Sequence, residues 1–371
     1  MQDIDHSAIS YTVLSGAFVL TMLFGAIAQH TRFCTMGAIA DVVNMDDWTR
    51  MRMWVLAIAV AVIGFNAMVG IGWIDARHSI YAGPQLLWLS LSVGGLMFGF
   101  GMVLASGCGS KNMVRVGSGN LKSLVVLLVL GVSAFATLKG ITAVLRANTL
   151  DRAVIDLPHG QNLPALMSAA TGMEIPRLAG LLGGVIGLAL VAWVLRRPEG
   201  RTANVWLGGA GIGAVIVGMW WLSGVVGYLP EDPNTLQENF LVTSSHRMEA
   251  LSMVAPVAYA LDWLLFFSDR SKVLTIGIVS VPGVIVGSAV MALATRTFRW
   301  EGFGGTEDTV NHLVGGLLMG VGGVMALGCT VGQGLSGMST LSLGSLLALF
   351  SIVAGGMLGL RYQIWRLDRL G

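Results

Sequence analysis

Long apolar stretches separated by short polar connections follow one another along the whole chain. Each holds about 18 or more mostly apolar residues, which is enough for a helix to cross roughly 30 Å of hydrocarbon. The pattern therefore predicts an all-α integral membrane protein with about nine transmembrane helices. We expect them at about residues 11–29, 52–73, 85–106, 121–145, 178–196, 204–222, 273–295, 310–328 and 342–360.

Four other stretches are too short to cross a bilayer and too apolar to lie in water. At membrane depth, non-helical backbone persists only where it is buried in protein or lines a wet cavity. We therefore expect short broken or re-entrant helices at residues 33–43, 109–119, 248–260 and 330–340.

One glycine-rich span occurs twice and ends in Gly-Cys both times. The copies cover residues 94–108 and 315–329, and without a gap they agree at more than half of their 15 positions. Glycines at close helical spacing let helix backbones approach one another. We therefore expect both copies to pack tightly against neighbouring helices.

The repeat extends beyond this motif and predicts two halves of opposite direction. Each half also has an arginine followed 16 positions later by a tryptophan: Arg32 with Trp48, and Arg247 with Trp263. The second half starts an odd number of spans after the first, so the pattern indicates an inverted-topology repeat of the kind found in many transporters. Within one membrane domain, we expect half one at about 11–145, a connecting span at about 178–196 and half two at about 204–360.

Composition and charge agree with this class of protein. The chain is 54% hydrophobic and 11% charged with a mean hydropathy of +0.75, which is typical of a protein in a bilayer. A net charge of +2 gives no reason to expect a nucleic-acid partner. The positive-inside rule favours an outer N-terminus and a cytoplasmic C-terminus, because this orientation puts fourteen Lys and Arg of the connections inside and seven outside.

The three cysteines are the first candidates for chemistry. An isolated buried cysteine is usually a small apolar residue, but Cys108 and Cys329 occupy the same place in both copies of the repeat. A thiol is a weak, soft hydrogen-bond donor, and the helix N-terminus expected after each break favours an anion. Cys34 is a third such position, with Glu249 as its repeat mate by spacing. We expect a soft, sulfur-bearing anion to contact these residues and the neighbours Gly107, Gly109, Gly328 and Thr330.

Two arginines lie at equivalent places in otherwise apolar stretches. Charges there are costly unless they are paired or functional. Arg32 and Arg247 therefore either extend to the membrane–water interface, or pair with a carboxylate, or attract an anion to a positively charged opening of the protein. The carboxylates available for pairing are Glu249, Asp41 and Asp262.

Two further residues close to the Gly-Cys motifs are candidates for contact with the anion. Lys111 either attracts it or merely follows the positive-inside rule, and Gln333 is a candidate hydrogen-bond donor. The chain has no Cys-x-x-Cys or His-x-x-x-His spacing, so we expect no metal and no cofactor. An odd number of cysteines does not indicate a disulfide framework.

The motifs as a whole resemble the YeeE/YedE family of inner-membrane sulfur transporters. The resemblance rests on Ala-Ser-Gly-Cys108, on Ala-Leu-Gly-Cys329-Thr-Val-Gly and on Arg32-Phe-Cys34-Thr-Met-Gly-Ala, and it covers nearly the whole chain. It implies a bacterial thiosulfate uptake protein shaped as an hourglass of transmembrane and short helices. It also implies that the three cysteines line a central path and pass the anion by S–H hydrogen bonds, with Cys108 on the side where the anion enters. A small cytoplasmic sulfur-carrier protein is an implied partner.

Other functions stay open at this point. After Cys108 the family often continues with a small residue and then Gly, whereas this chain has Gly109-Ser-Lys111-Asn112. A selenium compound or another sulfur anion is therefore an alternative substrate. A membrane sulfurtransferase would carry a persulfide on Cys108 or Cys329, but no paired general acid and base accompanies them, and we expect a transporter rather than an enzyme. A structural subunit with cysteines as packing residues is the third class.

Overall fold

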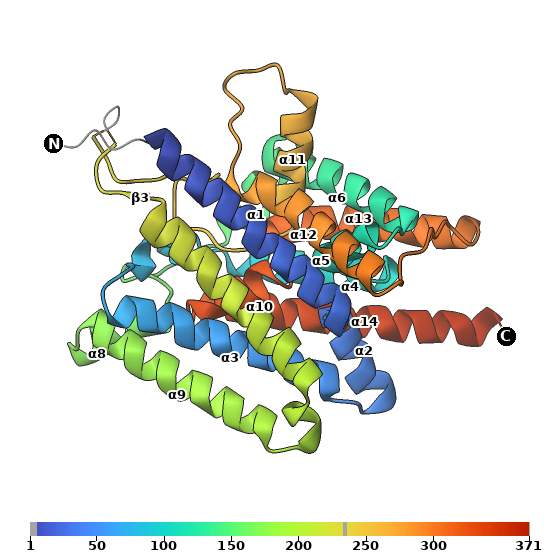
Figure 1. Ribbon diagram of the computed structural model, residues 1–371, viewed down its shortest axis with the longest axis horizontal. Helices are drawn as coiled ribbons and strands as arrows, with labels where there is room; N and C mark the ends of the chain where they lie inside the picture. The colour runs from blue at the N-terminus through green and yellow to red at the C-terminus, as the bar shows by residue number, and fades with distance from the viewer. Residues whose placement is uncertain (1–5, 233–235, 371) are drawn as a thin grey trace.

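The computed structural model describes residues 6–232 and 236–370, which form long helices lying side by side (Figure 1). Within these residues, eight helices are long and apolar enough to cross a membrane. This finding confirms the predicted all-α integral membrane fold. The helices of the first half are α1 (His6–Thr31), α2 (Thr35–Met45), α3 (Thr49–Gly70), α4 (Trp88–Leu104), α5 (Gly109–Gly117) and α6 (Leu121–Lys139). The remaining helices are α7 (Ile141–Asn148), α8 (Leu163–Thr171), α9 (Ile175–Leu195), α10 (Ala203–Trp221), α11 (Ala255–Leu265), α12 (Ile276–Ala294), α13 (Thr306–Met325) and α14 (Leu343–Leu370).

The span predicted at 310–328 corresponds to α13, which is not among these eight helices; it has the expected length but a polar start. Glu307 and Asp308 lie in its first turn, and the helix is less apolar than the eight others. Both carboxylates are paired with cations of other helices, Asp308 with Lys122 at 2.8 Å and Glu307 with Arg366 at 2.9 Å. A helix start of this kind suits the polar edge of a membrane, where charges stay hydrated.

Each of the four predicted short segments contains a short helix. α2, α5 and α11 are α-helices of 11, 9 and 11 residues. The fourth is the π-helix η5 (Gly332–Gly337). The other short turns are the 3-10 helices η1 (Ala76–His78), η2 (Leu150–Arg152) and η3 (Pro198–Arg201) and the π-helix η4 (Leu222–Val226).

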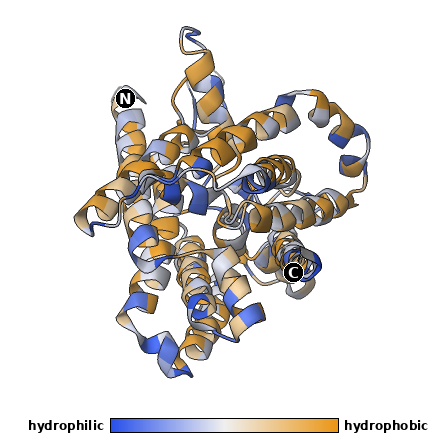
Figure 2. Cartoon of the chain, turned by 90° about the vertical axis from the view of Figure 1, so that its right-hand side faces the viewer, coloured by the Kyte–Doolittle hydropathy of each residue, from blue (hydrophilic) through white to orange (hydrophobic). Residues whose placement is uncertain are grey.

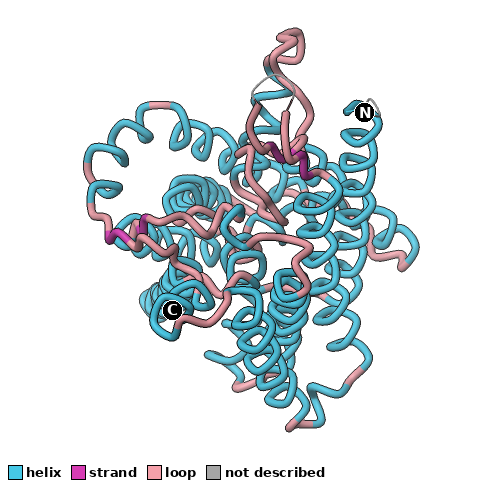
Figure 3. The backbone as a smooth tube through the Cα atoms, turned by 90° about the vertical axis from the view of Figure 1, so that its left-hand side faces the viewer, coloured by secondary structure: helices cyan, strands magenta, loops and turns pink. Residues whose placement is uncertain are grey.

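In the described part of the chain, the strands form two short antiparallel ribbons in the connections, as Figure 3 shows. One joins β1 (Gln85–Leu86) to β2 (Ile155–Asp156), and the other joins β3 (Tyr228–Leu229) to β4 (Asn239–Phe240). Figure 2 looks along the helices from the C-terminal end, and the most hydrophilic residues gather there mainly in the connections. The apolar surface thus follows the lengths of the helices.

The predicted span 121–145 is shorter in the structure. α6 ends at Lys139, Gly140 is not helical, and α7 continues without a buried residue. Glycine at this position ends the helix because it lacks the preference for helical backbone that other residues have. The sequence pattern also missed α8, which lies between the predicted spans 121–145 and 178–196.

The contacts between helices repeat when the two halves are exchanged. α4 packs against α14, and its counterpart α13 packs against α6; α1 packs against α12, and its counterpart α10 packs against α3. α4 also packs against α13, and α1 against α10. In Figure 1, α1 runs away from the end where the chain starts, whereas α10 runs back toward it. The two halves therefore have opposite directions, as an inverted-topology repeat requires.

Glycines bring α4 and α13 into backbone contact at two equivalent points. A methyl group on Gly94 would lie 2.7 Å from the Gly322 carbonyl oxygen, and one on Gly315 would lie 2.7 Å from the Gly101 carbonyl oxygen. Separations below about 3 Å are shorter than real contacts of a methyl carbon. The glycine ridges thus do what the sequence predicts and allow the two helices to touch.

We predict that Gly322→Ala destabilises the protein. Its new methyl group would lie 2.6 Å from the Gly94 carbonyl oxygen and 2.6 Å from the Phe98 nitrogen, and backbone atoms cannot yield cheaply. Overpacking of this kind costs about 1–3 kcal/mol. Thermal unfolding of the purified protein measures the loss. Gly184→Ala is the control, because nothing lies within 4 Å of the added methyl group; an equal melting temperature for both variants would contradict the prediction.

Candidate functional site

Both glycine-rich spans end in the same backbone motif. Ser106 and Leu327 follow the two helices with φ of +55° and +54°, in the left-handed region. The next residues, Gly107 and Gly328, each donate their backbone N–H to a carbonyl of the preceding helix at 2.8 Å. This arrangement is the Schellman motif, which satisfies carbonyls that a helix end leaves unpaired. It allows each helix to stop inside the protein without a large cost in lost hydrogen bonds.

A side-chain amide ties the start of each following segment back to the break. The Asn112 amide donates to the carbonyl oxygens of Gly107 at 2.9 Å and Cys108 at 3.1 Å. The Gln333 amide donates to the carbonyl oxygen of Ala326 at 2.6 Å. Asn112 and Gln333 each follow their cysteine by four positions. In this structure Gln333, predicted as a donor to the anion, donates to the backbone instead.

The three cysteines lie at the starts of three short helical segments. Cys34 and Cys108 precede α2 and α5 directly, and Cys329 precedes η5 by three positions. The Cys34 sulfur accepts the Gly37 N–H at 3.3 Å, and the Cys329 sulfur accepts the Gly332 N–H at 3.4 Å. The expected placement of thiols beside helix N-termini is therefore present. Such ends carry positive potential that favours an anion.

A first cavity of about 520 Å³, here called the basic cavity, lies beside Cys34. Its lining includes five cations and one carboxylate: Arg32, Arg50, Lys111, Arg115, Arg299 and Glu301. Arg299 pairs with Glu301 at 3.1 Å, and the Asn120 amide also donates a hydrogen bond to the Glu301 carboxylate. These two hydrogen bonds lower the pKa of the Glu301 carboxyl.

The remaining cations give the basic cavity its net positive charge. Arg50 pairs with Asp41 at 3.0 Å, and Arg115 donates to the Ser106 carbonyl oxygen at 2.8 Å. Arg32 and Lys111 form no salt bridge within the described residues. Of the three alternatives for Arg32, pairing with a carboxylate is thus not seen among the described residues, and its charge is available to an anion.

A second cavity of about 330 Å³, here called the Glu249 cavity, lies at the other end of the molecule. It is lined by the first residues of α12, among them Ile276 and Ser280, whereas the basic cavity is lined by Thr295 and Thr297 just after that helix. α12 has 19 residues and is about 28 Å long. The two cavities therefore approach from opposite ends of the membrane-spanning bundle.

Both cavities stop at the Gly-Cys breaks. Ser106 and Lys111, on either side of Cys108, line the basic cavity, and Leu327 and Gly328, next to Cys329, line the Glu249 cavity. Cys108 is 1% exposed and Cys329 is 0% exposed. Cys108 and Cys329 are thus buried beside the two breaks, and of the three cysteines only Cys34 is among the residues that line the basic cavity.

The structure makes Val254, rather than Glu249, the counterpart of Cys34. Each of these two residues directly precedes an 11-residue short helix, α2 or α11. Glu249 lies five positions before Val254 in a non-helical segment. This segment runs extended because its backbone pairs with the connection after α3, through the bridge between Ser79 and Met248. Aligning the two halves by their equal arginine-to-tryptophan spacing therefore matches the wrong residues at the starts of α2 and α11.

Arg247 and Glu249 are held by the backbone and do not pair with each other. The Arg247 guanidinium donates to the carbonyl oxygen of Arg77 at 2.9 Å. The Glu249 carboxylate accepts the Ser245 N–H at 2.8 Å, and the Ser223 hydroxyl donates to the Glu249 carbonyl oxygen. Arg247 thus secures a connection, whereas the Glu249 side chain lines a cavity.

Several residues of the cavities carried no clear signal in the sequence. Arg50 and Arg115 counted only toward the orientation of the chain, since nothing marked them as neighbours of Cys34. Tyr81 and Arg146 come from connections between spans, yet both line the Glu249 cavity. The Tyr81 hydroxyl is buried without a hydrogen-bond partner among the described residues, so it is free to donate to a ligand.

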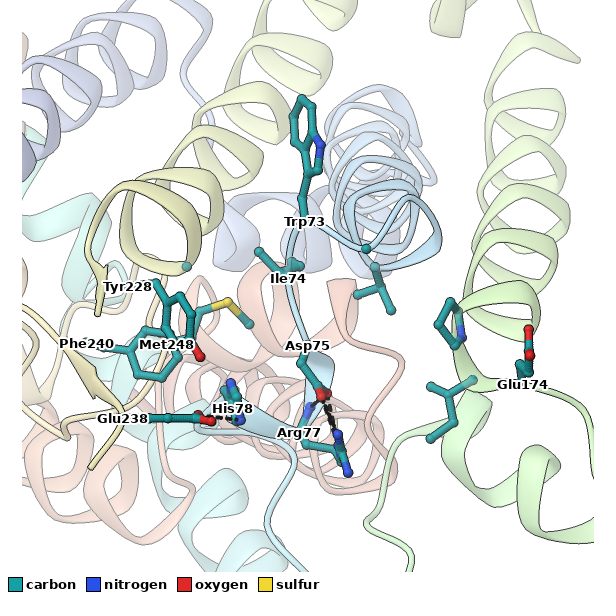
Figure 4. A pocket seen from close by; sticks show the side chains of 15 residues that line it. Trp73, Ile74, Asp75, Arg77, His78, Glu174, Tyr228, Glu238, Phe240 and Met248 are labelled. Atoms are coloured by element: carbon teal, nitrogen blue, oxygen red, sulfur yellow. Dashed lines mark hydrogen bonds and ion pairs between the residues drawn. The ribbon is translucent and has the colours of Figure 1, made fainter. Parts of the chain in front are cut away.

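A third and larger cavity of about 690 Å³ lies between α9 and the connections after α3 and α10, and Figure 4 shows its lining. Its carboxylates are Asp75, Glu174 and Glu238, of which Glu238 pairs with His78 at 3.2 Å. Burial raises the pKa of Asp75, but hydrogen bonds from Arg77 outweigh burial and lower it. With three carboxylates against Arg77 and His78, this lining favours an anion less than the basic cavity does.

Comparison with known proteins gives a consistent result. The sequence model of the family described as sulphur transport matches residues 30–358. The chain is 28% identical to the thiosulfate transporter TsuA of Escherichia coli (strain K12), over 87% of this chain and 86% of that protein. It is 25% identical to the thiosulfate transporter TsuA of Spirochaeta thermophila, over 90% of this chain and 94% of that protein. A shorter match of 28% identity, over 31% of this chain and 27% of that protein, involves the probable transporter YedE of Escherichia coli.

We predict that Asn112→Ala loosens the first break and lowers stability. Asn112 is fully buried, and without its amide the Gly107 carbonyl loses its hydrogen bond. A buried polar group left unpaired costs about 1–3 kcal/mol. Thermal unfolding measures the effect. Asn148→Ala removes an amide bond to a helix carbonyl at an exposed position and is the control; a larger loss for that control would argue against the assigned role of Asn112.

Proposed function

The chain belongs to the sulphur transport family, and from this premise we propose that it carries thiosulfate, or a closely related sulfur anion, across a membrane. Two relatives that match over most of their length are named thiosulfate transporters. The observation that carries the proposal is the pair of cavities that reach the two Gly-Cys breaks from opposite ends of α12. Buried residues at the breaks, among them Cys108 and Cys329, lie between the ends of the basic cavity and the Glu249 cavity in this proposal, which corresponds to a transporter in a closed state.

Charge in the basic cavity supports an anionic substrate. Arg32 and Lys111 bring two positive charges that no described carboxylate neutralises, and Lys111 lies three positions after Cys108. A cavity of one sign of charge concentrates ions of the opposite sign. Thiosulfate carries two negative charges, so this cavity suits it better than it suits a neutral sulfur compound.

The cysteines provide the contacts that we propose for the sulfur atoms. In the proposed path the anion passes from Cys329 to Cys108 and then to Cys34, each time accepting a hydrogen bond from a thiol. The neighbouring residues Gly107, Gly109, Gly328 and Thr330 are the further contacts that we propose for the anion. A thiol is a weak donor, so each contact would be loose enough to release the anion to the next.

The orientation of the chain decides which cysteine the anion meets first. We propose an outer N-terminus in a bacterial inner membrane, because the positive-inside rule then puts the basic cavity, with its five cations, on the cytoplasmic side. The Glu249 cavity would then face outward, and Cys329, beside Gly328, would be the first thiol. The expectation that Cys108 meets the entering anion is incompatible with this orientation. A cytoplasmic sulfur-carrier protein at the basic cavity stays a prediction.

We predict that Cys108→Ala reduces uptake of labelled thiosulfate at least tenfold in cells lacking their own thiosulfate route, because the middle thiol of the path is lost. Cys108→Ser keeps a hydroxyl donor and should retain more activity. The amount of protein in the membrane must be equal in all strains. Full uptake by Cys108→Ala would refute the proposed path, and a stable sulfur adduct on Cys108, detected by mass spectrometry, would favour a sulfurtransferase instead.

We also predict that Lys111→Met raises the KM for thiosulfate about tenfold, equivalent to about 1.4 kcal/mol, since a charge beside the path is removed. The dependence of uptake on salt should weaken as well, because salt screens charge attraction. Lys139→Met, at the end of α6 and paired only with the Phe135 ring among the described contacts, is the control. Equal effects of the two substitutions would show that Lys111 has no special role.

A further inference from the structure

The Glu249 carboxylate is fixed inside the wall of the Glu249 cavity. Its side chain accepts the Ser245 N–H at 2.8 Å, and its backbone carbonyl accepts the Ser223 hydroxyl. The segment that carries it pairs with the connection after α3, because Met248 exchanges backbone hydrogen bonds with His78 and Ile80. The carboxylate therefore stays beside the cavity and cannot easily turn away when an anion enters.

The cations near Glu249 are engaged elsewhere. Arg146 is the only cation among the cavity's lining residues, and it pairs with Asp151 at 3.0 Å. Arg247 donates to the backbone of Arg77. Glu249 itself forms no salt bridge within the described residues. An ionised Glu249 therefore gives this cavity a negative charge that no neighbouring side chain cancels.

Glu249 also lies in the same cavity as the second Gly-Cys break. Tyr81, Glu249 and Gly328 line this cavity together. An anion bound between the Tyr81 hydroxyl and the second Gly-Cys break thus has the Glu249 carboxylate as a neighbour. The negative charges of the anion and of an ionised Glu249 would repel each other strongly inside this cavity, where water is partly excluded.

From this geometry we infer that Glu249 is a proton-binding site, and that a thiosulfate anion entering the Glu249 cavity binds together with one proton held on that carboxyl group. The inference rests on the proposed function. Protonation removes the repulsion, and the neutral carboxyl group becomes a donor to the anion. Because coupling between two ligands is reciprocal, the bound anion strengthens proton binding as much as the proton strengthens anion binding.

Other titratable groups face this carboxylate and must be separated from it. Tyr81 and Tyr259 are phenols that stay neutral in the neutral and mildly acidic range. Arg146 is paired with Asp151, the other carboxylate close to the cavity. His246 lies three positions before Glu249, and its imidazole is a second group that can bind a proton. A protonated His246 would also favour an anion, so it needs its own variant.

The test measures thiosulfate binding by calorimetry with the full chain in detergent at pH 8, 7 and 6. Buffers of different ionisation enthalpy report the number of protons bound with each anion. We expect about one proton and an affinity that rises about tenfold from pH 8 to pH 6. For Glu249→Gln, which keeps the acceptor for Ser245 and lacks the charge, we expect no proton uptake and tight binding that changes less than twofold with pH.

The variants give each outcome a meaning. His246→Gln should keep the proton uptake and pH dependence of the wild type, and their loss in this variant alone would assign the proton to His246 and overturn the inference. Binding by the wild type without proton uptake would also overturn it, even if Glu249→Gln failed to fold. Absence of thiosulfate binding at every pH would overturn the proposed function and this inference together.

Discussion

The backbone contact between α4 and α13 is the constraint on which the rest of the structure depends. Equivalent glycines from the two halves meet twice, Gly94 with Gly322 and Gly101 with Gly315. Because the contact joins corresponding helices of opposite direction, it fixes where each helix ends relative to the other. The end of each helix thus lies beside a glycine of the other, Ala326 beside Gly94 and Ala105 beside Gly315, and one cavity reaches each of the two Gly-Cys breaks.

A break in a membrane helix is tolerable only if its polar groups are satisfied locally. Both breaks satisfy their backbone carbonyls in the same way. Each has a Schellman motif, at Ser106 or Leu327, and a side-chain amide that donates to the backbone, from Asn112 or Gln333. The solution leaves the N-terminal ends of short helices beside the cysteines. The same backbone arrangement that stabilises the break thus creates a place with positive potential for an anion.

The two cavities differ in charge although the fold repeats. Among the described residues, Arg32 and Lys111 of the basic cavity form no salt bridge, and neither does the Glu249 carboxylate of the other cavity, where Arg146 pairs with Asp151. The position equivalent to Lys111 in the second half is Gly332, and the counterpart of Cys34 is Val254. Different residues at equivalent positions therefore give the two cavities different charges within a repeated scaffold.

The sequence by itself determined the class of the protein, most of its spans and the repeat. Apolar length is a local property, and the matching glycines and cysteines lie in two stretches that align without a gap. The sequence did not reveal which residues of distant segments lie together. Glu249 was matched with Cys34, and four cavity residues were not recognised as such: Arg50, Arg115, Tyr81 and Arg146. Only the tertiary structure decided these points, because the extended segment around Met248 delays α11 by pairing with residues about 170 positions away. Which charges remain unpaired likewise depends on contacts between helices far apart in the sequence, such as that of Lys122 with Asp308, and not on local pattern.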